Sequence, residues 1–123
     1  MNNDGKKNIL KEKAFSFAIR IVKAYQYLVK ERNEFVLSKQ LLRSGTAIGA
    51  LVHEAEYAQS VPDFINKMSV ALKEANETEY WLMLLKESNY MDDESYSSIV
   101  NDCQELLRLL ISTINTSKKK NKS

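Results

Sequence analysis

The chain has 123 residues, of which 44% are hydrophobic and 28% charged, and its single cysteine, Cys103, excludes an intramolecular disulfide. The length is typical of one domain. No apolar run approaches the roughly 20 residues that cross a bilayer, and the start of the sequence does not resemble a secretory signal. We therefore expect a cytoplasmic protein without a membrane partner. The formal net charge of +2 hides an uneven distribution, because residues 1–53 sum to +6, residues 54–117 to −8 and the final lysines to +4.

The first half of the chain predicts two helices after a short polar start. Residues 1–8 offer no apolar face, so we expect a disordered leader. Apolar residues then recur every three or four positions from Ala14 to Leu28, which predicts an amphipathic helix near residues 9–32. After a short polar link without glycine, the same spacing from Leu37 to Ala55 predicts a second helix over residues 35–58.

A third helix is predicted from the sequence QSVPDF onward. Pro62 suits a first helical turn, and Ser60 or Asp63 is placed to accept hydrogen bonds from the exposed amides. The apolar stripe continues to about Ser88.

The acidic segment NYMDDES then interrupts the pattern, with Asp92 as the expected N-cap of a fourth helix. Its apolar stripe runs from Tyr96 to Ile114, and residues 117–123 are expected to be a disordered basic tail. No alternating strand pattern competes with these helices. The prediction is an all-α, antiparallel up-down-up-down four-helix bundle over residues 9–116.

Two of the three glycines, Gly45 and Gly49, lie inside the predicted second helix. A glycine inside a helix costs about 1 kcal/mol relative to alanine, and residues four apart lie on the same face. The pair therefore predicts a close approach of another helix. Either the glycines accommodate a bulky neighbour of the same chain, such as Tyr80 or Trp81, or they form a contact between subunits.

Charged residues flank this small-residue face. Arg43 and Glu54 are eleven residues apart, which places them on one stripe of the helix, where they are expected to pair with charges on the third helix, including Glu74 and Glu77. The predicted helix-packing or polar network comprises Arg43, Ser44, Gly45, Gly49, Glu54, Glu74, Glu77 and Trp81.

Nothing in the sequence predicts catalysis. A di-iron bundle needs two Glu-x-x-His motifs, but His53 is the only histidine, and too few nitrogen or sulfur ligands remain for zinc. Cys103 falls on an apolar stripe, as an inert buried thiol would. No phosphate-binding glycine loop or catalytic triad motif is present. We therefore expect no enzyme activity, no metal and no cofactor.

Lysines cluster near both ends of the chain. In an up-down-up-down bundle the two termini emerge at the same end, so these lysines should converge there and attract RNA or DNA, although a merely solubilising tail is the alternative. The predicted nucleic-acid-binding residues are Lys6, Lys7, Lys11, Lys13, Lys118, Lys119, Lys120 and Lys122.

The motifs QLLRSGTAIGALVHEA and FINKMSVALKEANETEYWLMLL, in this order, resemble a four-helix-bundle family first found in the intervening sequences of bacterial 23S rRNA genes and often mislabelled as ribosomal proteins. The resemblance spans residues 12–112 and places the family's Arg-Ser-Gly motif at residues 43–45, its helical Glu at Glu54 and its second motif at residues 73–82. Many members have Ala-Asn where this chain has Ala50-Leu51.

The resemblance implies an antiparallel bundle that assembles into a ring-like homopentamer. A related branch, the strongly basic accessory protein of diversity-generating retroelements, partners a reverse transcriptase and nucleic acid, but this chain is much less basic. The leading hypothesis is a non-enzymatic homo-oligomer that binds RNA or another nucleic acid through its basic ends. The alternative is a protein-protein interaction adaptor without nucleic-acid binding.

Overall fold

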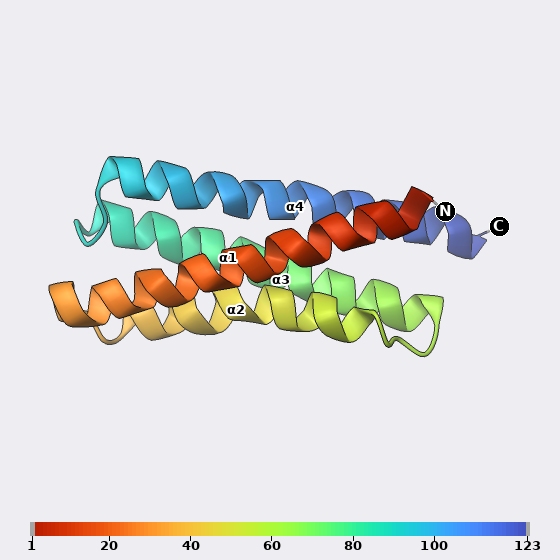
Figure 1. The fold of residues 1–123 in the computed structure, drawn as a ribbon, viewed down its shortest axis with the longest axis horizontal. Helices are drawn as coiled ribbons and strands as arrows, with labels where there is room; N and C mark the ends of the chain where they lie inside the picture. Colours follow the sequence, from red (N-terminus) through yellow and green to blue (C-terminus); the bar gives the residue numbers. More distant parts are fainter. Residues whose placement is uncertain (1, 123) are drawn as a thin grey trace.

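A computed structural model describes the backbone of residues 2–122 and the side chains of residues 9–122. It contains four α-helices: α1 (Asn2–Arg32), α2 (Leu37–Ala55), α3 (Val61–Glu87) and α4 (Asp93–Lys122). Each helix packs on the next one in the chain, and a smaller contact between α1 and α4 closes the bundle. Figure 1 shows the helices alternating in direction, with α1 running obliquely across the others. The predicted all-α up-down four-helix bundle is therefore confirmed.

The apolar stripes face one another along the bundle axis. The core contains Leu10, Phe17 and Ile21 from α1, together with buried residues from the other three helices, among them Leu41, Ile48, Met68, Leu82, Leu85, Cys103, Leu106 and Leu110. A few polar side chains are also buried, but every buried side-chain nitrogen or oxygen that the structure describes has a hydrogen-bond partner. No described helix is both long enough and apolar enough to cross a membrane.

The start of α3 carries the expected cap. The Asp63 amide donates to Ser60 Oγ at 3.1 Å, and the Asp63 carboxylate in return accepts from the Gln59 amide at 3.2 Å. The start of α4 is capped by Asp92, whose Oδ1 accepts from the Ser95 amide at 2.7 Å. These bonds satisfy amides that have no partner within the helix.

The start of α2 is capped by a residue that the sequence analysis did not single out. Glu34 is only 8% exposed, and its carboxylate accepts hydrogen bonds from the backbone amides of Val36, Leu37 and Ser38. Burial raises the pKa of Glu34, but these hydrogen bonds outweigh it, so the pKa lies below its ordinary value. The carboxylate is thus held in its charged form at a positive helix end.

The outer helices are longer than the sequence predicts. The backbone is helical from Asn2 through the expected leader and as far as Lys122 in the expected tail. Neither segment contains proline, and lysine is a good helix former that also suits the negative C-terminal end of a helix. Both segments therefore extend helices that the core has already nucleated.

Candidate functional site

Both chain termini lie at one end of the bundle, as Figure 1 shows. This end also contains the connection between α2 and α3. The tail lysines lie in the last turns of α4 and are exposed; they are Lys118, Lys119, Lys120 and Lys122. Lys6 and Lys7 lie in the helical start of α1, but their side chains are outside the described residues. The tail lysines therefore lie at the same end of the bundle as the start of α1.

Two of the predicted binding lysines lie further along α1 and form ion pairs within the chain. Lys11 Nζ is 2.8 Å from a Glu56 carboxylate oxygen, and Lys13 Nζ is 3.2 Å from Glu105. The hydrogen bond to Glu56 raises the pKa of Lys11. All four side chains are about 40% exposed, so these pairs are weak and open to exchange with a phosphate.

The polar network between α2 and α3 centres on Arg43. Its guanidinium donates to Glu74 at 3.2 Å and also to Glu77, which in addition accepts from Trp81 Nε1 at 3.2 Å. The Arg43 hydrogen bond is the main cause of a lowered Glu77 pKa. Glu54 does not join this network: it is exposed, and the described part of the chain gives its side chain no ion pair. The cluster joins two helices at the surface.

Beneath this network, a pair of hydroxyls connects α2 and α3 inside the bundle. Thr78 Oγ1 is 2.9 Å from Ser44 Oγ and 2.8 Å from the Glu74 carbonyl oxygen, and both hydroxyl side chains are fully buried. Hydrogen-bonding the two hydroxyls to each other avoids the cost of burying either one alone.

The two glycines of α2 face α1. A Cβ on Gly45 would lie 2.7 Å from Cγ1 of Ile21, and a Cβ on Gly49 would lie 3.3 Å from the Ala14 carbonyl oxygen. Their close neighbours are therefore residues of α1 in the same chain and not Tyr80 or Trp81, whose rings pack edge to face on α3. The absence of side chains at these positions lets α1 and α2 pack closely.

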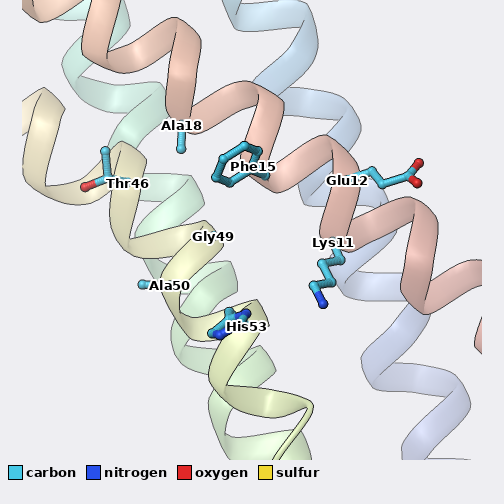
Figure 2. A pocket seen from close by; sticks show the side chains of 8 residues that line it. All are labelled: Lys11, Glu12, Phe15, Ala18, Thr46, Gly49, Ala50 and His53. Atoms are coloured by element: carbon cyan, nitrogen blue, oxygen red, sulfur yellow. The ribbon is translucent and has the colours of Figure 1, made fainter.

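A groove of about 720 Å³ lies along the outside of this α1–α2 contact. Its walls, shown in Figure 2, are Phe15 and Ala18 from α1 and Thr46, Gly49, Ala50 and His53 from α2. Lys11 lies at the end of the groove nearer the termini, while the carboxylate of Glu12 points away from it (Figure 2). Phe15 is 67% exposed.

This groove was not predicted from the sequence, because it lies outside the apolar stripe that faces the core. The signal in the sequence is Phe15, which lies with Ile19 and Val22 on a second apolar stripe of the first helix, turned away from the core residues Ala14 and Ile21. Of this stripe, Phe15 lines the groove, and Ile19 and Val22 do not. Spacings of three and four residues hold equally within an exposed stripe, so periodicity does not tell which of two stripes is buried.

Reactive groups are sparse in this structure. Cys103 is fully buried, donates to the Ala75 carbonyl at 3.4 Å and has its pKa raised to about 12 by burial, so the thiol is protonated at neutral pH. Within the described residues, no three His, Cys, Asp or Glu side chains come together as metal ligands. The features that remain are surface features: the lysine-rich end, the groove and the outer face of α3.

Residues 6–112 match the family model described as 23S rRNA-intervening sequence protein. Among solved structures, the chain is similar to a protein of unknown function from the S23 ribosomal protein family of Bacteroides thetaiotaomicron. The two are 59% identical, the match covers 89% of this chain and 98% of that one, and the TM-score is 0.89. No curated protein matches the chain.

Proposed function

Because the chain belongs to the 23S rRNA-intervening sequence protein family, we propose that it is a non-enzymatic homo-oligomer that binds RNA or another nucleic acid at its lysine-rich end. The observation that carries this proposal is the position of the two termini: the last turns of α4, with their exposed lysines, lie at the same end of the bundle as the lysine-containing start of α1 (Figure 1). Each phosphate neutralised by a lysine releases a bound counterion, and this release drives binding at low salt.

The charge layout supports the same location. Residues 1–53, which include α1 and most of α2, sum to +6, whereas residues 54–117 sum to −8. A polyanion is therefore attracted to the α1–α2 side and to the tail, and repelled by the α3–α4 side. Assembly into an oligomer, with a pentamer favoured, multiplies the tail lysines and so strengthens binding through multivalency.

The outer face of α3 is the surface that we assign to assembly. Tyr80 and Met83 are about half exposed there, next to the partly exposed Trp81 and the Arg43 ion pairs. Aromatic residues, methionine and arginine are enriched in protein interfaces. A pentamer of the 14.1 kDa chain has a mass of about 70 kDa, which light scattering distinguishes from a monomer.

The test is fluorescence anisotropy with a structured RNA over a salt series. The first variant changes the four tail lysines to glutamine. The matched control changes four other exposed lysines to glutamine, so that both variants have the same net charge; these are Lys23, Lys30, Lys39 and Lys73. We expect the tail variant alone to weaken binding sharply and to reduce the slope of log affinity against log salt by up to about 3 to 4, the value for four phosphate contacts. Equal losses in both variants would show that net charge and not the basic end is responsible.

A second candidate function, a protein-interaction adaptor, rests on the same α3 face. If the partner is a different protein, Tyr80→Ala combined with Met83→Ala should abolish its binding without changing the mass of the isolated protein. The complex should also survive nuclease treatment. Loss of self-association in this double variant supports the homo-oligomer instead.

A further inference from the structure

The groove between α1 and α2 exposes aromatic rings at the positively charged side of the bundle. Phe15 points from α1 toward α2, above the small residues Gly49 and Ala50 (Figure 2). His53 extends the groove toward the termini, and its ring meets that of Tyr57 edge to face at 5.9 Å. Tyr57 is 73% exposed. Exposed apolar groups that gather along one groove mark a binding site, whereas singly scattered ones need no explanation.

The size and floor of the groove suit a flat ring. Its volume of about 720 Å³ falls within the usual range of roughly 300–1,000 Å³ for small-molecule sites. Glycine and alanine on α2 leave space opposite Phe15, so a planar group can lie against the aromatic face without displacing a side chain. A bulky aliphatic residue at either position would fill this space.

The charges at the groove determine what kind of flat ring is expected. Lys11 lies at its terminal end in an exposed and exchangeable pair with Glu56, and the tail lysines lie at the same end of the bundle. The groove is also part of the +6 half of the chain. A ligand that joins planar rings to closely spaced negative charges matches both features, and a polynucleotide has this chemistry.

We propose that the α1–α2 groove binds unpaired bases of a single-stranded nucleic acid, which stack on Phe15 while Lys11 and the tail lysines contact the phosphates. This inference rests on the proposed nucleic-acid binding and adds the strand type to it. In a duplex the base faces are stacked on one another, so an exposed aromatic side chain gains little from it. In a single strand every base has a free face, and stacking on aromatic side chains is a recurrent mode of binding.

The experiment measures anisotropy of three labelled probes: an unstructured single strand, the corresponding duplex, and an abasic strand with the same number of phosphates. The test variant is Phe15→Ala, with Phe15→Trp to restore a stacking face. Ile19→Ala is the matched control, because Ile19 is a half-exposed apolar residue one turn away on α1 that does not line the groove. Light scattering of each variant records its oligomeric state.

We expect Phe15→Ala to weaken single-strand binding by roughly 5-fold to 150-fold, the usual effect of losing one stacked base. Phe15→Trp and Ile19→Ala should bind like the wild type. The abasic strand should bind weakly and equally to wild type and Phe15→Ala, and the salt slope of Phe15→Ala should be unchanged because no phosphate contact is removed.

Other outcomes overturn the inference in distinguishable ways. If Phe15→Ala binds the single strand like the wild type while the tail-lysine variant loses binding, the proposed function stands and the groove is not the base site. If the duplex binds as tightly as the single strand, the strand assignment is wrong. If Phe15→Ala changes the mass of the particle, the groove is an interface between copies. If the wild type binds none of the probes at low salt, both proposals fail.

Discussion

Replacing Gly45 by alanine should destabilise the bundle, although the same change at an ordinary helical glycine stabilises. The new Cβ would lie 2.7 Å and 2.8 Å from the two γ carbons of Ile21. Both carbons are attached directly to the Ile21 Cβ, so rotating the side chain moves one away only by bringing the other closer. Helix α1 or α2 must therefore shift.

The magnitude follows from two opposing effects. Overpacking a core position costs about 1–3 kcal/mol, and exchanging glycine for alanine within a helix recovers about 1 kcal/mol. We expect Gly45→Ala to lower the free energy of unfolding by about 1 kcal/mol, and by at most about 2 kcal/mol.

The sign should reverse when the obstructing carbons are removed. In an Ile21→Ala background both γ carbons are absent, so Gly45→Ala should raise the free energy of unfolding by about 1 kcal/mol, giving a coupling energy of about 2 kcal/mol between the sites. Ile21→Val is the control background: valine keeps two γ carbons, so Gly45→Ala should remain destabilising in it.

Urea unfolding followed by circular dichroism at one fixed protein concentration measures these differences, since the stability of an oligomer depends on concentration. Gly5→Ala is a reference because nothing lies within 4 Å of its added Cβ. A Gly45→Ala variant that is more stable than the wild type, or that behaves identically in the Ile21→Ala and Ile21→Val backgrounds, would refute the close-contact explanation.

Three further predictions follow from individual side chains. Glu34→Gln should lower stability by about 1–2 kcal/mol near neutral pH, because a neutral amide caps α2 less well than a carboxylate. The pKa of Glu34 is lower in the folded than in the unfolded chain, so its carboxylate contributes fully to the free energy of unfolding above the usual pKa of 4.5. This contribution is lost as the pH falls through the folded-state pKa. The melting temperatures of the wild type and Glu34→Gln should therefore converge between pH 7 and pH 3. Cys103 should resist a disulfide-exchange reagent at pH 8 in the native protein and react promptly in guanidinium, because its pKa is raised to about 12; fast native labelling contradicts the buried position. Glu77→Ala should shift the fluorescence emission of the sole tryptophan, Trp81, because it removes the hydrogen bond from Trp81 to Glu77. It should change the melting temperature by only a few degrees, as expected for an ion pair that lies largely at the surface. An unchanged emission spectrum would argue against the Trp81–Glu77 hydrogen bond.

The periodicity of apolar residues was enough to predict the four helices and their order of packing. The stripes from Ala14 to Leu28 and from Tyr96 to Ile114 enter the core because burying such a stripe is the main source of helix stability in a protein. The caps at Ser60 and Asp92 were also predictable, since their interactions are local in the sequence.

What periodicity leaves open is the neighbour of each helix face. A stripe on α2 meets α1 on one side and α3 on the other, and the sequence does not state how the helix is rotated between them. Tyr80 or Trp81 of α3, or a second subunit, was therefore as plausible a neighbour for Gly45 as Ile21 of α1, which it contacts. The Glu34 cap was not predicted for a different reason. A glutamate three residues before a helix can cap it only when the chain bends back toward the helix. Here Asn33 forms that bend, with a φ of 54°.

Because both termini lie at one end of the bundle, the order of the helices along the chain can be changed without changing how the helices pack (Figure 1). A short linker from residue 122 to residue 2 would close the chain into a ring, which could then be opened in the connection between α3 and α4 at the far end of the bundle (Figure 1). Such a circular permutant has the same core and the same tail lysines, but its new termini lie among acidic residues that include Asp92 and Asp93. A fusion partner or surface attachment at these termini leaves the basic end and the α1–α2 groove open to solvent.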